Sequence, residues 1–359
     1  MNEILFIRAS FPISNDNAYF TITAVKHYNR YGRRGKEGNQ VTANFDEALC
    51  RERFRSIGLA VTRTERRRGP FAAALYDVWT AAPDGAESRY VYKIPPVERI
   101  GEFEVLGALG RELEPWLPEG IARFESPPRA IVMRYAGEPI LPPERVGAVS
   151  EKDRLEAYGL VSSRLAELHL RTAPMTERWV REGKAAPYAY SRAWADMLFS
   201  QAAGAIDEAG FAALRRISDA FYAGYSPAAM RGGTAFTHGD PHWGNALRLG
   251  ERITLIDWEW TNAAAPMRDV AILVQEEPDD DVLTHVAAEH ARRLVQGGFP
   301  GTYGDVMADF DRMMVDNSIM TLCWDVALYR RGDIGSERLR ESFERRFARI
   351  EAFWNRVRG

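Results

Sequence analysis

The chain has 359 residues, enough for two lobes and a sizeable core, and its composition is that of an ordinary globular protein. Its formal net charge of -3 gives no electrostatic reason to expect nucleic acid or an anionic membrane as a partner. Its 2 cysteines argue against a disulfide framework without excluding a single bridge, and no apolar run reaches the roughly 18 residues of a membrane span.

Residues 1–45 contain no motif that we recognise, and we expect them to form an N-terminal extension. Their first residues lack the charged-then-apolar order of a signal peptide, which together with the few cysteines predicts a cytoplasmic protein. The basic, glycine-rich stretch at 26–38 is typical of a solvated loop, with contact to phosphate as the alternative. A partner-binding module is a second alternative for this extension.

A helix and a small antiparallel sheet are predicted next. β-Branched and aromatic residues recur in three short runs, and Asp84-Gly85 is a hairpin signal between the second and the third. The predicted elements are a helix over 45–57 and strands over 59–65, 71–81 and 89–94. Lys93 therefore lies near the end of the third strand.

An apolar strand is predicted over 130–133.

From Ser150 onward the pattern is mostly helical. Ser150 is an N-cap candidate because Asp153 follows three residues later, and a leucine stripe ending at His169 is typical of core packing. We interpret His169 as structural. Further amphipathic stretches are predicted over 191–208, 212–224 and 336–357.

Residues 234–260 interrupt the helical region with a polar loop and a hairpin. Strands are predicted over 235–237, 246–249 and 253–256, with the loop at 238–245. Asp240, Asn245 and Asp257 thus fall within a few residues of one another. A carboxylate can accept the proton of an attacking hydroxyl, and amide and carboxylate oxygens suit Mg²⁺, so this set fits phosphoryl transfer. The alternative is a zinc site of His238, Asp240 and His242, but no further His or Cys partner lies nearby.

The stretches HGDPHWGN at 238–245 and IDWE at 256–259, followed by Asp269-Val270-Ala271, resemble the motifs of the aminoglycoside phosphotransferase and choline kinase superfamily. The resemblance implies an α/β (α+β), protein-kinase-like bilobal fold. It places a small antiparallel-sheet N-lobe over 46–135 and a large helical C-lobe over 136–359.

The same resemblance implies roles for single residues. Asp240 matches the catalytic base, and Asn245 and Asp257 match the magnesium ligands. Lys93 matches the lysine that holds the phosphates. Residues 101–109 resemble the helix of this family that carries the ion-pair partner of the lysine, and its register makes Glu102 that partner. Glu104, two residues further on, would point to a different face of the helix.

The segment after the strand at 130–133 resembles the interlobe hinge. Adenine is expected to meet Met133 and backbone groups near Arg134 and Ala136. The arginine-rich turn before the second strand lacks the full glycine pattern that covers phosphates in protein kinases, and a solvent-facing charge run is the favoured interpretation.

The acceptor pocket is the least determined part of the site. In this family it is built largely from C-lobe helices, and carboxylates beside aromatic faces would suit a cationic amine. The candidate acceptor residues are His242, Trp243, Glu259, Trp260, Asp316 and Trp324. The acidic run at 276–281 is a further candidate, although acidic residues at a helix start also favour the helix dipole.

These observations predict an O-phosphotransferase that uses ATP, with GTP not excluded, and Mg²⁺. Its expected acceptor is a hydroxyl of a small molecule such as an aminoglycoside-like antibiotic, choline, ethanolamine, a sugar or homoserine. We expect a monomer or homodimer with no nucleic-acid or membrane partner. The alternative is a protein kinase or a nucleotide-binding regulatory protein of the same fold, although the Asp-Phe-Gly and Ala-Pro-Glu signals of protein kinases are missing.

Overall fold

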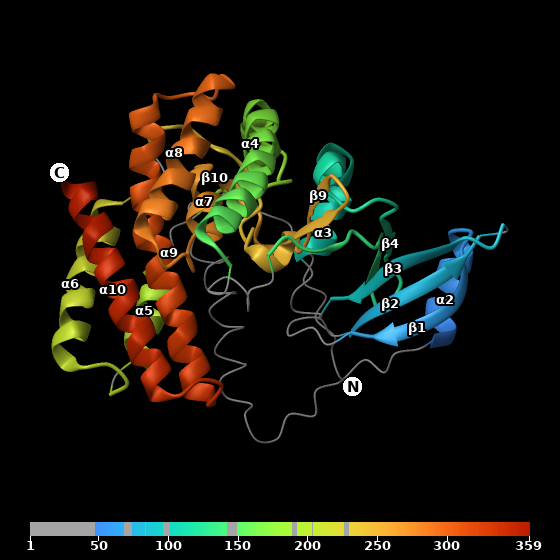
Figure 1. The fold of residues 1–359 in the computed structure, drawn as a ribbon, viewed down its shortest axis with the longest axis horizontal. Helices are drawn as coiled ribbons and strands as arrows, with labels where there is room; N and C mark the ends of the chain where they lie inside the picture. Colours follow the sequence, from blue (N-terminus) through green and yellow to red (C-terminus); the bar gives the residue numbers. More distant parts are fainter. Residues whose placement is uncertain are drawn as a thin grey trace, which may run out of the picture.

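A computed structural model describes most of the chain (Figure 1). The described residues are 47–67, 74–82, 84–95, 101–141, 149–188, 192–202, 204–225 and 230–359. The predicted extension over 1–45 lies outside them. Among the described residues, no helix is both long and apolar enough to cross a membrane.

A five-stranded antiparallel sheet forms one end of the molecule (Figure 1). Its strands are β1 (Ala60–Arg66), β2 (Ala74–Ala81), β3 (Glu87–Ile94), β4 (Ala122–Phe124) and β5 (Ala130–Arg134), in the order β1-β2-β3-β5-β4. Lys93 is paired with Leu75 on β2 and Ile131 on β5. The predicted strands are thus confirmed, with shifts of a few residues at their ends.

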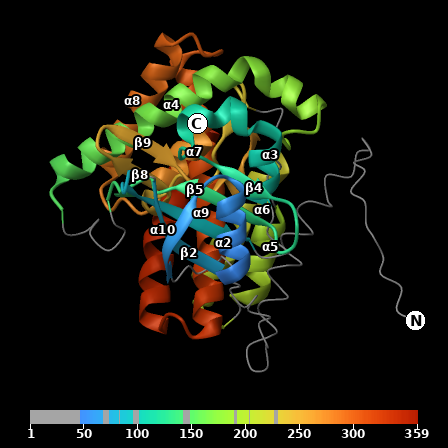
Figure 2. The same cartoon turned by 90° about the vertical axis from the view of Figure 1, so that its right-hand side faces the viewer.

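The two faces of this sheet pack against different elements. Helix α2 (Glu47–Ser56) covers the outer face (Figure 2). There Cys50 and Phe54 form a small core with Tyr92 and Val132. Successive side chains of a strand point to opposite faces, so Lys93 lies on the inner face.

Helix α3 (Gly101–Leu113) joins the sheet to the helical region. Its residues Phe103, Leu106 and Leu109 belong to the same large core as Met133 of β5 and most of the helical region. Figure 1 shows α3 and β9 between the sheet and the long C-terminal helices. The helical elements are η1 (Glu114–Trp116), α4 (Glu151–Arg181), α5 (Arg192–Gln201), α6 (Glu208–Gly224), α7 (Met267–Leu273), α8 (Asp280–Gln296), α9 (Tyr303–Arg331) and α10 (Ser336–Arg358).

Short strands interrupt the helical region where the polar loop was predicted. They are β7 (Ala235–Thr237), β8 (Ala246–Leu249), β9 (Arg252–Leu255) and β10 (Asn262–Ala264), with turns of 3-10 helix at η4 (Trp243–Asn245) and η5 (Trp258–Trp260). A further short strand, β6 (Glu138–Pro139), precedes α4 in the chain. β6, β8 and β9 form one sheet, and β7 pairs with β10. The small sheet and the large helical region confirm the α/β, protein-kinase-like bilobal fold.

Helix boundaries follow local capping chemistry. Ser150 accepts a hydrogen bond from the Asp153 amide (3.2 Å), which confirms the predicted N-cap of α4. The single stretch predicted over 191–208 is wrong, because α5 ends at Gln201 and a new helix begins at Glu208. Asp207 caps α6 by accepting from the Gly210 amide (2.8 Å), which separates the two helices.

The acidic run at 276–281 caps a helix and forms ion pairs with neighbouring helices. Asp279 is the N-cap of α8. Its neighbours are ion-paired, in the pairs Glu276–Arg346 (2.6 Å), Glu277–Arg154 (3.1 Å) and Asp280–Arg349 (2.8 Å). Glu276 and Glu277 precede α8 and Asp280 begins it, so these ion pairs connect the start of α8 to α4 and α10. Of the three carboxylates, Glu277 is fully buried and therefore requires its cationic partner.

Candidate active site

Lys93 joins the two halves of the site. Its Nζ lies 2.6 Å from Glu102 Oε2 on α3 and 2.8 Å from Asp257 Oδ1 after β9. Lys93 and Asp257 are 164 positions apart in the sequence, so only the fold brings them together. Glu104, in contrast, lies on the exposed side of α3 and pairs with Arg129. The ion pair between Lys93 and Glu102 is therefore the one that the family resemblance implies.

The two carboxylates determine the protonation state of Lys93. Burial favours the neutral amine, but Glu102 and Asp257 outweigh this effect and raise the pKa of Lys93 above its ordinary value. The ammonium group is thus charged at neutral pH although only 17% of its side chain is exposed. A fixed positive charge at this position suits an anionic ligand.

Glu102 also positions the backbone around Asp257. Its Oε1 accepts from the amides of Asp257 (3.0 Å) and Trp258 (3.4 Å). Asp257 has φ 68° and is the only non-glycine residue with positive φ in the described part of the chain. Such backbone strain costs about 1–3 kcal/mol and is typical of functional positions. The bonds from Glu102 stabilise the strained turn that presents the Asp257 carboxylate.

The polar loop holds Asp240 beside Asn245. The Asn245 side-chain amide donates to the Asp240 backbone oxygen (2.9 Å) and to Asp240 Oδ2 (3.3 Å). The Asn245 backbone oxygen accepts from the Ile256 amide (3.0 Å), which places Asn245 next to the residue before Asp257. The structure therefore gathers Asp240, Asn245 and Asp257 around the ends of β8 and β9.

His238 supports this loop and does not bind a metal. Its Nδ1 accepts from the Asp240 amide (3.2 Å), and its Nε2 donates to the Ile256 carbonyl (3.0 Å). Burial lowers the pKa of His238 to about 4, although Asp269 opposes that effect. Both ring nitrogens are engaged, and no group of three or more His, Cys, Asp or Glu in the described part of the chain could hold a metal. The zinc alternative is therefore wrong for these residues.

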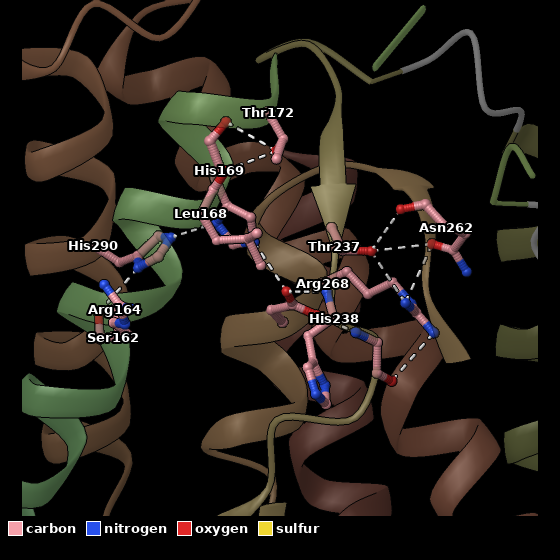
Figure 3. A network of polar contacts seen from close by, with 12 residues as sticks. Ser162, Arg164, Leu168, His169, Thr172, Thr237, His238, Asn262, Arg268 and His290 are labelled. Atoms are coloured by element: carbon pink, nitrogen blue, oxygen red, sulfur yellow. Dashed lines mark hydrogen bonds and ion pairs between the residues drawn. The ribbon is translucent and has the colours of Figure 1, made fainter. Parts of the chain in front are cut away.

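A chain of buried polar groups anchors the loop from the helical side (Figure 3). Asp269 accepts from the amides of His238 (2.8 Å) and Gly239 (2.7 Å) and from His169 Nε2 (2.9 Å). His169 Nδ1 lies 3.2 Å from His290 Nε2 on α8, and His290 Nδ1 lies 2.9 Å from Ser162 Oγ. The interpretation of His169 as structural is confirmed.

The expected hinge follows β5, where Met133 is buried, Arg134 is exposed and Ala136 is half-buried. The Arg134 amide donates to the Glu119 carbonyl (2.9 Å), so an adenine at Arg134 cannot use this N–H group. Gly137 has φ 101°, and a side chain there would overlap the backbone of Arg248. The hinge backbone is thus packed closely against β8.

The acceptor candidates near the loop occupy different environments. His242 is 41% exposed, and its Nε2 lies 3.7 Å from Asp240 Oδ2. Trp243 is buried, with its ring centroid 4.2 Å from that of Tyr158 on α4, so it packs in the core. Glu259 and Trp260 are half-buried in η5. Of these four residues, the structure brings His242 into direct proximity of Asp240.

The two candidates on α9 also differ. Asp316 is buried and accepts hydrogen bonds from the hydroxyls of Tyr188 and Tyr222 (2.7 Å for Tyr222). Burial raises the pKa of Asp316, although the two tyrosines oppose that effect. Trp324 is half-buried two helical turns further along α9.

Three further polar residues at the site were not recognised from the sequence: Ser162, His290 and Arg268. Ser162 on α4 and His290 on α8 carry no local signal in the sequence, because their partners are distant in the chain. Arg268 does carry one, since it directly precedes Asp269 of the recognised motif.

Comparison with known proteins decides the family. Residues 70–313 match the model of the phosphotransferase enzyme family. The chain belongs to this family. A search of curated proteins by sequence finds no relative.

Solved structures of similar fold support the assignment of the phosphotransferase fold. A protein from Ralstonia eutropha assigned as an aminoglycoside phosphotransferase has 17% identity and a TM-score of 0.57, covering 86% of this chain and 99% of its own. A choline/ethanolamine kinase family protein from Mesorhizobium loti has 18% identity and a TM-score of 0.54, covering 81% and 88%. Macrolide 2'-phosphotransferase MphH from Brachybacterium faecium has 20% identity and a TM-score of 0.51, covering 86% and 98%.

Proposed function

We propose that this phosphotransferase moves the γ-phosphate of ATP to a hydroxyl group of a small molecule, with Mg²⁺ as the metal. The observation that carries the proposal is the contact of Lys93 with both Glu102 and Asp257, next to the loop that holds Asp240 and Asn245. Phosphoryl transfer needs positioning groups and positive charge around the phosphates more than covalent chemistry, and these residues supply both.

The nucleotide would bind with its phosphates at Lys93 and its base at the end of β5. Lys93 would balance the phosphate charge, and Glu102 would keep its ammonium group oriented. Met133, Arg134 and Ala136 would border the adenine. Among the solved neighbours, LicA was determined with AMP, an aminoglycoside 2'-phosphotransferase with GDP, and spectinomycin phosphotransferase with ADP. These complexes support nucleotide binding and keep GTP as an alternative donor.

The donor set of Asn245 and Asp257 fits Mg²⁺. Asp257 offers a carboxylate, and the Asn245 amide nitrogen is engaged by Asp240, which leaves the amide oxygen for a cation. Hard cations prefer such oxygen ligands and take others from phosphate and water. When bound, Mg²⁺ would neutralise charge on the phosphates.

Asp240 would act on the acceptor. Its side chain is 30% exposed, so an entering hydroxyl can reach it. The carboxylate would orient this hydroxyl and accept its proton as the oxygen attacks the phosphate. His242 lies beside Asp240 and would contact the acceptor, with Glu259, Trp260, Asp316 and Trp324 as further candidates. The named acceptors of related structures, choline, macrolides and spectinomycin, support a small molecule but do not select one.

Nucleotide consumption tests the proposal. The protein is incubated with MgATP or MgGTP and amino alcohols, aminoglycosides, macrolides, nucleoside antibiotics or sugars, with Asp240→Ala as the blank. We expect Asp240→Ala to lower turnover at least about 100-fold while the Kd for MgATP changes less than about threefold. Asp196→Ala, an exposed carboxylate on α5, is the matched control. Retention of more than about a tenth of the wild-type rate by Asp240→Ala would contradict the proposed base.

A further inference from the structure

Arg268, at the start of α7, is a buried cation that reaches four different segments of the site (Figure 3). Its side chain donates from Nη1 to Thr237 Oγ1 (3.3 Å), the Trp260 carbonyl (3.2 Å) and Asn262 Oδ1 (3.2 Å), and from Nη2 to the Gly239 carbonyl (3.3 Å). Only 7% of the residue is exposed. A buried guanidinium is costly unless its donors are paired, so these contacts specify its position.

The adjacent residues Arg268 and Asp269 hold opposite sides of the same loop backbone. The Asp269 carboxylate accepts from the amides of His238 and Gly239, while the Arg268 guanidinium donates to the Gly239 carbonyl. The Asp240 amide, which belongs to the same peptide group as the Gly239 carbonyl, donates to His238 Nδ1. The peptide group directly before Asp240 is therefore held at its carbonyl by Arg268 and at its amide by His238.

Arg268 also connects this peptide to the segment that follows Asp257. Its Nη1 group donates hydrogen bonds to the carbonyl of Trp260, the last residue of η5, and to the side chain of Asn262 in β10. Gly239 has φ 86°, and a Cβ atom there would come within 2.0 Å of the Trp260 oxygen. The two segments are thus in backbone contact, with the guanidinium bridging their carbonyl groups.

Tyr188 determines where the guanidinium can lie. The Arg268 guanidinium lies 4.6 Å from the Tyr188 ring centroid, in the geometry of a cation–π contact. The Tyr188 hydroxyl donates to Asp316 on α9. The Asp269 carboxylate supplies negative charge nearby, while all four hydrogen bonds of Arg268 in the described part of the chain go to neutral acceptors.

From this geometry we infer that Arg268 is a positioning residue for phosphoryl transfer, which fixes the peptide before Asp240 relative to the segment after Asp257. The inference rests on the proposed function for its kinetic part. Loss of the guanidinium lets the Asp240 carboxylate move relative to the phosphate, and a misplacement of about 1 Å can cost on the order of 100-fold in rate. Nucleotide affinity depends on Lys93 and the hinge, so it changes little.

Arg268→Gln tests this inference against a matched control, Arg349→Gln. Arg349 is also 7% exposed and donates to two backbone carbonyls, those of Gln275 and Glu277, but it lies on α10 away from the loop. We measure MgATP turnover with water and with the best acceptor from the screen, MgADP binding by calorimetry, and amide exchange over 236–241. Arg268→Gln should lower kcat about 30- to 100-fold with a MgADP Kd within threefold of wild type, and should raise exchange over 236–241. Arg349→Gln should keep kcat within threefold.

Arg268→Lys separates positioning from general stability. A lysine retains the charge but not the planar fork of donors, so Arg268→Lys should recover part of the rate that Arg268→Gln loses. If Arg268→Gln does not fold, Arg268→Lys replaces it in the same comparison with Arg349→Gln. Equal kcat values for Arg268→Gln and Arg349→Gln, or unchanged exchange over 236–241, would overturn the inference. If the wild-type protein transfers no phosphate at all, the proposed function fails, and amide exchange alone then decides whether Arg268 holds the loop.

Discussion

At the scale of single residues, the site depends on carboxylates that each serve several donors. Glu102 binds the Lys93 ammonium through one oxygen and two backbone amides through the other. Asp269 likewise accepts from two amides and one histidine. A carboxylate with three donors is held in one orientation, and removing it leaves several buried groups unpaired. Such residues are therefore more sensitive to substitution than their exposed neighbours.

Glu102→Gln and Glu104→Gln form a matched pair on the same helix. Glu102→Gln removes a buried ion pair, so we expect kcat/KM for MgATP to fall about 10- to 100-fold with a loss of stability of about 3 kcal/mol. Glu104 is 57% exposed and pairs with Arg129, and exposed pairs contribute about 0–1 kcal/mol, so Glu104→Gln should stay within twofold of wild type. Steady-state kinetics and urea unfolding measure both effects. Similar losses of kcat/KM and stability in the two variants would show that Glu102 is not the residue that orients Lys93.

At the scale of elements, the polar loop is positioned by close backbone contact with η5. Gly239 and Gly58 both have positive φ, but they differ in the space around the α-carbon. A Cβ atom at Gly239 would lie 2.0 Å from the Trp260 oxygen, whereas Gly58 has nothing within 4 Å. Comparing alanine substitutions at these two glycines therefore separates the cost of positive φ from the cost of disturbing the close contact between the loop and η5.

Gly239→Ala should therefore be far more damaging than Gly58→Ala. Positive φ alone costs an alanine about 1–2 kcal/mol, which we expect for Gly58→Ala with activity near wild type. Gly239→Ala must also move the loop away from η5, so we expect a larger loss of stability and a loss of turnover of more than 100-fold. Thermal unfolding and turnover of both variants check this prediction. Similar losses of stability and turnover in the two variants would show that the loop can move away from η5 without affecting the site.

At the scale of the whole molecule, two buried histidines make stability depend on pH. Burial lowers the pKa of His238 to about 4, and burial together with His169 lowers the pKa of His290 well below its ordinary value of 6.5. The unfolded chain binds protons on these side chains below about pH 6.5, whereas the folded protein does not. The contribution of these two neutral histidines to the free energy of unfolding is therefore fully present above pH 6.5 and is lost as the pH falls toward 4.

Urea unfolding at several pH values between 7 and 4 tests this dependence. Each buried histidine contributes up to about 1.4 kcal/mol per pH unit in this window. His290→Gln should reduce the slope by about one proton, while His285→Gln, an exposed position on the same helix, should leave it unchanged. A wild-type free energy of unfolding that is flat from pH 6.5 to 4.5 would contradict the prediction.

The sequence alone determined the elements whose signals are local. Short apolar stretches predicted the strands at β7, β8 and β9, the Ser150–Asp153 pair predicted the start of α4, and motif order predicted that Asp240, Asn245 and Asp257 belong to one site. These patterns depend on neighbours a few residues away, because strand periodicity and helix capping are short-range effects.

Only the tertiary structure decided which buried charges meet. The acidic run at 276–281 is matched to arginines of α4 and α10, Asp316 is held by two tyrosines, and Arg268 donates to the backbone carbonyls of Gly239 and Trp260. A charged side chain in a sequence carries no sign of its partner, because the cost of burying it is offset by whichever group packing brings near. The contact of Lys93 with Asp257, 164 positions away, is the clearest case.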